Sequence, residues 1–228
     1  MYTFANMLAL DFHIRTLANK DWATLLFVIA LILIAMVRTF FQSRFTDYIK
    51  LLYSDKYVKV YKDSSFYMMS GFNLFLFLVN LFSISFIVIL ILDHYHLGSK
   101  TDWMLFLRVF TLLAVFVLSK YLFEKIIGVT FDIEELIDNF NLNKVSYRNY
   151  IGLVLLPLAL FLYYNNYLTN TLIFVIITAV LIINALTYLL SLRNYQNLIL
   201  SKFYYFILYL CALEIAPYYF IYYLVTKN

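Results

Sequence analysis

One carboxylate dominates the chemistry that this sequence could perform. Glu214 lies near the middle of the apolar run from Lys202 to Val225, five residues after Tyr209 in the stretch YLCALEIAP. A charge at such a depth in a membrane-length segment is costly, so residues of this kind usually have a role. Burial favours the neutral carboxyl group, which can donate a hydrogen bond. Pro217 has no N–H, so it leaves the carbonyl oxygen of Leu213 without its helical partner beside that carboxyl group.

Three roles are open to Glu214, and we favour the structural one. In that role the neutral carboxyl group bridges to Asn73, Asn80, Asn184 or Arg108 of neighbouring helices. A proton or ion relay is the second choice. A catalytic acid is the third, because we find no second carboxylate, histidine or nucleophile at a comparable depth. We find no acyl-transfer, metal or phosphate-loop motif, so we expect no catalytic residues and no cofactor.

The Asp-His cluster and the single cysteine could also take part in chemistry, but we infer no metal or catalytic site from either. Asp93, His94 and His96 form a short cluster in a loop, but a metal site needs three or four well-placed ligands, and we reject one here. Cys211 is the only cysteine, so an internal disulfide is excluded and a packing role is expected.

The composition is that of a membrane protein. Hydrophobic residues make up 64% of the 228 residues and charged residues 13%, against about 45–50% and about 25% in soluble domains. The basic residues flank apolar runs, as membrane topology requires, and give no nucleic-acid signature. We therefore expect an all-α, polytopic helical protein with the lipid bilayer as its main partner.

Six apolar runs are interpreted as transmembrane helices, of which the fourth is short. They cover about 22–41, 66–92, 103–123, 151–164, 172–192 and 203–225, in a single domain from 21 to 228 that follows an interfacial segment over 1–20. Trp22 and Trp103 are interface anchors and are expected at the same, outer interface. Pro157 and Pro217 are expected to kink their helices.

Polar residues inside these runs predict contacts between helices. Asn73 and Asn80 are seven residues apart and share a helix face, which Ser83 extends. Such residues usually bond a neighbouring helix, and a ligand site is the minority interpretation. Arg108 is expected to extend towards the nearer interface, with Glu214 as the alternative partner. Lys120 and Glu124 form an ordinary i, i+4 pair.

Two segments between spans are amphipathic and carry opposite charge. Residues 44–62 are basic and residues 132–138 are acidic, and each repeats apolar residues at helical spacing. We expect two short helices that lie flat on the membrane and near each other. The basic one is expected on anionic headgroups, with a docking surface for a soluble partner as the alternative.

The basic residues also predict the orientation. Six spans place twelve on one side: Arg38, Arg44, Lys50, Lys56, Lys59, Lys62, Lys120, Lys125, Lys144, Arg148, Arg193 and Lys202. The other side holds five: Arg15, Lys20, Lys100, Arg108 and Lys227. The positive-inside rule then places both termini outside the cytoplasm.

Short motifs are distributed along nearly the whole chain after Lys20: Asp21-Trp22, Arg44-Phe45, Tyr147-Arg148-Asn149 with Gly152 and Pro157, and Tyr209-Leu210-Cys211 with Leu213-Glu214-Ile215 and Pro217. Together they resemble a Bacteroidota inner-membrane family catalogued as a domain of unknown function (four-two-seven-one). The resemblance implies a Gram-negative cytoplasmic membrane and an envelope context, so both termini are expected in the periplasm. It identifies no catalytic residues.

Three functions follow as hypotheses. The first is a non-enzymatic subunit of an inner-membrane complex, for example in protein export or envelope biogenesis, with other membrane proteins as partners. The second is a small proton-coupled transporter or channel that uses Glu214, Arg108 and the Asn73–Asn80 face. The third is a lipid-modifying enzyme with Glu214 as its acid.

Overall fold

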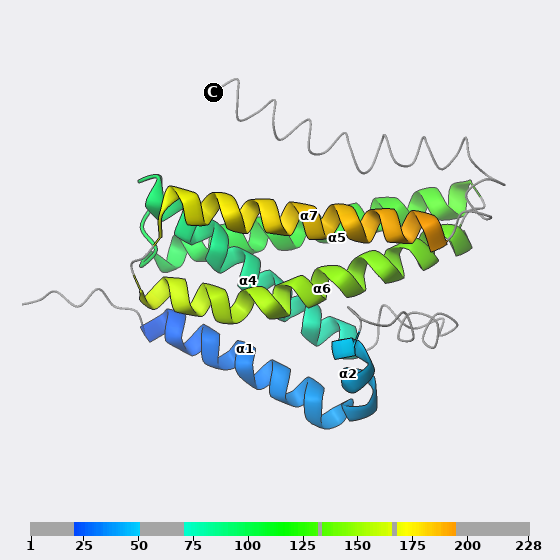
Figure 1. Ribbon diagram of the computed structural model, residues 1–228, viewed down its shortest axis with the longest axis horizontal. Coiled ribbons are helices and arrows are strands. Elements are labelled where there is room, and N and C mark those ends of the chain that lie inside the picture. Colours follow the sequence, from blue (N-terminus) through cyan, green and yellow to red (C-terminus); the bar gives the residue numbers. More distant parts are fainter. Residues whose placement is uncertain (1–20, 51–70, 132–133, 166–167, 195–228) are drawn as a thin grey trace, which may run out of the picture.

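A computed structural model describes residues 21–50, 71–131, 134–165 and 168–194. Every regular element in these ranges is a helix: α1 (Asp21–Phe40), α2 (Gln42–Ile49), α4 (Gly71–His94), α5 (Trp103–Thr130), α6 (Glu134–Tyr164) and α7 (Asn170–Asn194) (Figure 1). The helices satisfy their own backbone hydrogen bonds, which is what apolar segments need in a bilayer. The expected all-α fold is therefore confirmed for the described part of the chain.

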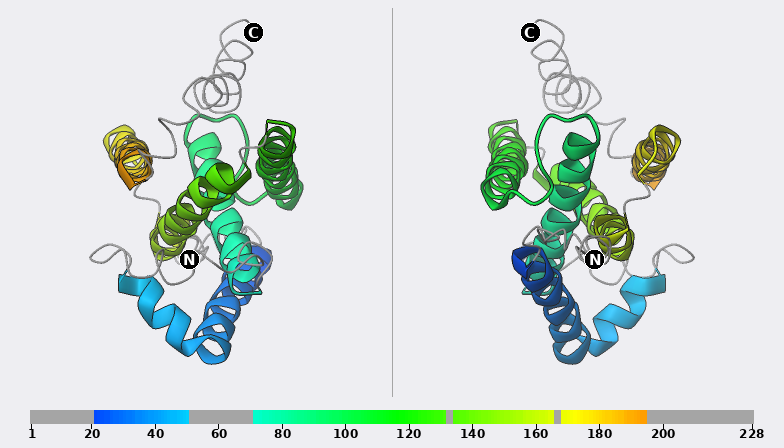
Figure 2. Two further views of the ribbon diagram at one scale, coloured as in Figure 1. Left: turned by 90° about the vertical axis from the view of Figure 1, so that its right-hand side faces the viewer. Right: turned by 90° about the vertical axis from the view of Figure 1, so that its left-hand side faces the viewer.

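Helices α4 and α6 form the centre of the bundle and make its most extensive contact. Helices α5 and α7 lie on opposite sides of this central pair, as the end-on views show (Figure 2). Helix α1 packs on α4 away from α7 (Figure 1). The outer helices therefore have broad apolar surfaces that face away from the bundle. Such surfaces are expected where lipid, and not water, surrounds the helices.

Five of the described helices are long and apolar enough to cross a membrane. These segments are Asp21–Phe40, Gly71–His94, Trp103–Thr130, Asn141–Tyr164 and Asn170–Thr187. They correspond in order to the first five predicted spans. The predicted sixth span, 203–225, and the predicted interfacial segment, 1–20, lie outside the described residues.

Helix α6 corrects two predictions. The acidic segment and the short span 151–164 are parts of one continuous helix, Glu134–Tyr164, whose membrane-length part begins at Asn141. The polar residues Asn141, Ser146 and Asn149 are each at most 2% exposed. Because neighbouring helices shield them, the membrane-length helix continues through them instead of ending there. Pro157 lies within the helix without dividing it.

Helix α2 differs from the predicted surface helix. Phe45 and Tyr48 pack with Phe72 and Leu142 in a buried cluster, and the Tyr48 hydroxyl donates to the carbonyl oxygen of Ser146 at 2.9 Å. Phe45 and Tyr48 therefore contact the bundle, because α4 and α6 offer them an apolar surface, whereas Ile49 of the same helix is 48% exposed. The remainder of the basic segment lies outside the described residues.

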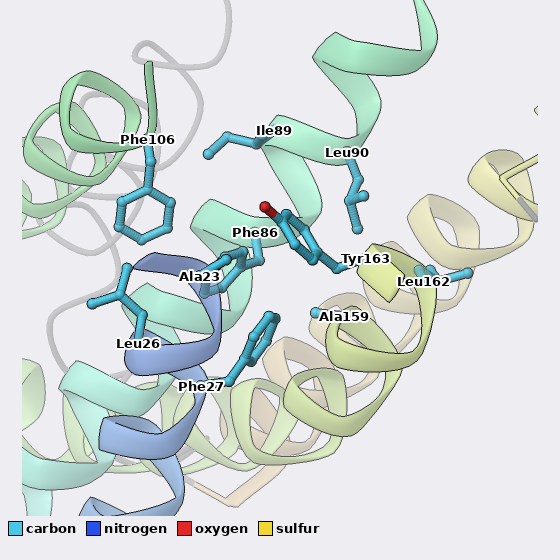
Figure 3. Packing of buried hydrophobic residues seen from close by; sticks show 10 residues of the cluster. All are labelled: Ala23, Leu26, Phe27, Phe86, Ile89, Leu90, Phe106, Ala159, Leu162 and Tyr163. Atoms are coloured by element: carbon cyan, nitrogen blue, oxygen red, sulfur yellow. The ribbon is translucent and has the colours of Figure 1, made fainter. Parts of the chain in front are cut away.

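An aromatic cluster holds the helices together at one end of the bundle. Phe27 of α1 stacks on Phe86 of α4 with ring centroids 4.1 Å apart (Figure 3). Trp22 and Trp103 meet edge to face at 5.4 Å, and the Trp22 indole N–H donates to the carbonyl oxygen of Thr101 at 3.1 Å. Both tryptophans thus lie at one end, as predicted, and we call this the tryptophan end.

Candidate functional site

The polar residues of α4 lie on one buried face, as their spacing predicts. Asn73, Asn80 and Ser83 are 3%, 1% and 0% exposed. The Ser83 hydroxyl donates to the carbonyl oxygen of Val79 within its own helix at 2.8 Å. The side-chain amide of Asn80 has a hydrogen-bond partner at neither its nitrogen nor its oxygen.

Asn80 lies at a very close approach of the two central helices. A Cβ atom placed on Gly152 of α6 would come within 2.6 Å of the Asn80 Cα atom. Real Cβ atoms do not make contacts this short, so glycine is required here for the backbones to meet. Small residues at a helix crossing permit such an approach in membranes.

The remaining predicted site residues are separated. Asn184 of α7 is exposed on the described bundle, and its amide donates to the carbonyl oxygen of Val180 at 2.8 Å. Arg108 is exposed on α5 and is absent from the lining of the cavities below. Glu214 and Pro217 lie outside the described residues.

A buried ion pair that the sequence analysis missed lies towards the opposite end. The Lys144 ammonium group donates to Glu124 at 2.7 Å, and the exposed fractions of the two side chains are 20% and 3%. Lys144 belongs to a polar face of α6 on which Asn141 and Arg148 also lie, at helical spacing. We call this region, with Lys120 of α5, the charged end.

A second group of ion pairs joins the last part of α5 to the first part of α6. Lys125 contacts Glu134 at 2.5 Å and Asp138 at 2.9 Å. The acidic segment therefore pairs with α5 in the described residues. Its predicted proximity to the basic segment stays a prediction, because most of residues 44–62 lie outside the described residues. These side chains are one third to one half exposed, so the group stabilises the bundle only modestly.

Two adjoining cavities open beside the charged end. The larger has a volume of about 520 Å³ and lies among α4, α5, α6 and α7, with Asn80 and Asn184 both in its lining. The smaller, of about 170 Å³, is lined by Asn73, Asn141 and Glu124 among others. Lys120, Lys144 and Arg148 line both cavities.

The histidine loop forms a structural connection at the tryptophan end. A ring nitrogen of His94 lies 2.7 Å from the side-chain oxygen of Asn170, and Asp93 accepts from the backbone N–H of Lys100 at 3.0 Å. Within the described residues, no three His, Cys, Asp or Glu side chains gather in a metal-binding arrangement.

Comparison with known proteins gives one match. The family described as "Domain of unknown function (DUF4271)" matches residues 23–225. No curated protein and no solved structure matches the chain.

Proposed function

The chain belongs to the DUF4271 family, and on this premise we propose that it is a non-enzymatic, multi-pass subunit of an inner-membrane complex of the bacterial envelope. Its candidate partners are other helical membrane proteins, in protein export or envelope biogenesis. Both termini are proposed to be periplasmic, on the basis of the twelve-to-five distribution of basic residues.

The observation that carries this proposal is the contrast between central and outer helices. Within the most apolar stretch of each helix, 50% of the residues are buried in α4, but 6% are buried in α5 and 11% in α7. Leu112, Val115 and Leu122 of α5 are 67%, 63% and 59% exposed. Two membrane-length helices therefore present faces on which transmembrane helices of a partner can pack.

Burial of the predicted polar face also supports a structural role. Asn73, Asn80 and Ser83 are enclosed by the central pair of helices, and Gly152 is required for close packing there. These features strengthen a rigid bundle that can support other subunits.

Site-specific photocrosslinking in native membranes tests the proposal. A photoreactive amino acid at Leu112 or Leu122 should give a discrete adduct with one membrane protein that also copurifies stoichiometrically. The matched control is Phe106, which lies on the same helix but is 2% exposed, and it should give no such adduct. Lipid adducts alone from both exposed positions, with the protein purified free of other proteins, would refute a subunit role.

A small proton-coupled transporter is the second candidate, and the cavity favours it. Glu124 is a buried carboxylate in the cavity lining, with Lys144 as its partner, and Glu214 is a second carboxylate within an apolar run. Under this alternative, Glu124→Gln or Glu214→Gln should abolish complementation of a deletion strain at normal protein levels. Under the subunit proposal, Glu214→Gln retains hydrogen bonding and should complement, whereas Glu214→Ala should be partly defective.

A further inference from the structure

The larger cavity opens towards the lipid beside α7. Most of its wall is aliphatic or aromatic, and Ile177 and Leu181 of α7, which belong to this wall, are 43% and 63% exposed. Ligand pockets are typically about 300–1,000 Å³ in volume and mostly apolar, with a few convergent polar groups, and this cavity of about 520 Å³ lies in that range. A ligand that enters beside these exposed residues comes from the bilayer, so we expect it to carry an apolar chain.

Two amide groups line this cavity at one level of the bundle. The ring of His94 at the end of α4 lies 2.7 Å from the side-chain oxygen of Asn170 at the start of α7, so these two residues mark a common level at the tryptophan end. Asn80 precedes His94 by 14 residues and Asn184 follows Asn170 by 14 residues, which is roughly 21 Å along each helix. Since the hydrocarbon core is about 30 Å thick, both amides lie within it.

The Asn80 amide has no partner among the described residues. Its side chain is 1% exposed, and neither its nitrogen nor its oxygen has a hydrogen-bond partner. Gly152 of α6 faces this amide and has no side chain to bond it. On the α7 wall, the Asn184 nitrogen donates to Val180, and its oxygen can accept from a ligand. Because buried polar atoms are nearly always paired, the Asn80 amide indicates a polar ligand group in the cavity.

The chemistry of that group follows from the atoms that line the cavity. Asn80 presents one kind of donor and one kind of acceptor, so it requires a ligand that both donates and accepts. An ionised group is costly at this depth. The basic residues of the lining do not require one, because Lys144 is paired with Glu124. Lys120 and Arg148 also have interactions within the protein. The lining therefore favours an uncharged group that contains a hydroxyl and a carbonyl oxygen.

We propose that the larger cavity binds the glycerol head of an uncharged acylglycerol. The free hydroxyl group of the lipid donates to the Asn80 oxygen, and the adjacent ester carbonyl oxygen accepts from the Asn80 nitrogen. In a monoacylglycerol, the second hydroxyl group donates to the Asn184 oxygen. One acyl chain follows the aliphatic wall and leaves the cavity beside Leu181. This site is additional to the subunit role and does not depend on it.

Native mass spectrometry of the purified full-length protein tests the proposal with three probes of equal chain length. These are a monoacylglycerol, a diacylglycerol and the methyl ether of that diacylglycerol, which has no hydroxyl group to donate. The protein should retain at least one of the two alcohols about tenfold better than the ether. A stronger retention of the monoacylglycerol or of the diacylglycerol identifies which of the two is the ligand. Equal retention of all three would overturn the proposal, because the Asn80 amide would then bond only water.

Two asparagine variants have a matched control. Asn80→Leu should abolish the preference for the alcohols over the ether, because leucine neither donates nor accepts. Asn184→Leu, at an exposed position, should weaken retention of the monoacylglycerol by about three- to tenfold. The control is Asn165→Leu, which also removes an amide bonded to the carbonyl oxygen four residues earlier, at 3.0 Å, but outside the cavity lining. It should keep the wild-type preference, and an equal loss in this control would overturn the proposal.

Two further variants cover the case in which Asn80→Leu does not fold, and they identify a competing occupant. Ile177→Trp fills the opening at an exposed position and keeps both amides, so it should lower retention of the alcohols; unchanged retention would contradict the site. A photoreactive amino acid at Ile84, in the cavity wall, should form an adduct with the added acylglycerol. An adduct with residues 203–225 of the same chain, and none with the lipid, would show that this segment fills the cavity and would overturn the proposal.

Discussion

Gly152 of α6 lies so close to Asn80 of α4 that the smallest possible side chain would collide with the facing backbone. At this contact the backbones of the central helix pair approach very closely, and the larger cavity begins beside it, because Asn80 lines that cavity. Helix spacing at this point therefore decides both the stability of the bundle and the width of the cavity.

Gly152→Ala should destabilise the protein, because the added methyl group forces α4 and α6 apart. Overpacking of this kind costs roughly 1–3 kcal/mol. The measurement is the free energy of unfolding of the purified protein in bicelles. Gly71→Ala is the matched control, since a Cβ atom there meets only ordinary contacts at 3.7 and 3.9 Å. Equal effects of the two substitutions would show that the close approach is not maintained in the bilayer.

Trp22 should contribute through its hydrogen bond as well as its ring. Trp22→Phe keeps an aromatic ring near Phe86 and Trp103 but leaves the carbonyl oxygen of Thr101 without its donor. We expect a loss of about 0.5–1.5 kcal/mol in the free energy of unfolding, and a loss of roughly 3–5 kcal/mol for Trp22→Ala. If both substitutions cost the same, the ring contacts contribute little and the hydrogen bond accounts for the whole effect.

The sequence predicted features that repeat within one helix. Asn73, Asn80 and Ser83 share a face because seven residues make nearly two helical turns, and that face is buried. The positions of Trp22 and Trp103 at one end followed from the apolar lengths between them. Each of these predictions needs only the local geometry of a helix and the thickness of a bilayer.

The charged end could not be predicted in the same way. Glu124 and Lys144 are 20 residues apart and belong to different helices, so their contact depends on how α5 crosses α6. The polar face of Asn141, Lys144 and Arg148 is visible in the sequence, yet such a face is typical of a surface helix. Only packing against α4 and α5 shows that it is enclosed.

Reporter fusions test which side of the membrane each end faces. Asn165 lies at the tryptophan end and Phe131 follows α5 at the charged end. Alkaline phosphatase should be active when fused at Asn165 or after Asn228, and green fluorescent protein should be fluorescent when fused at Phe131. An active phosphatase at Phe131 would reverse the orientation, and a cytoplasmic C-terminus alone would contradict six spans.

Glu124 and Lys144 should be energetically coupled, so that their joint contribution to the free energy of unfolding is not the sum of two independent contributions. Glu124→Leu or Lys144→Met leaves one partner charged and largely enclosed, and each should lower the free energy of unfolding by roughly 1–3 kcal/mol. The double variant Glu124→Leu/Lys144→Met removes both charges and restores apolar contact. It should therefore cost less than the two single substitutions together.

A double-mutant cycle on the purified protein measures this coupling, which should be at least about 0.5 kcal/mol. Lys125→Gln is the control, since that lysine contacts Glu134 and Asp138 where all three side chains are substantially exposed, and exposed pairs contribute about 0–1 kcal/mol. Because Glu124 is 3% exposed, its pair should also resist added salt, whereas the effect of Lys125→Gln should shrink as salt rises. Additive single-substitution effects, or salt sensitivity equal to that of Lys125, would mean that water reaches Glu124 and that the charged end is open.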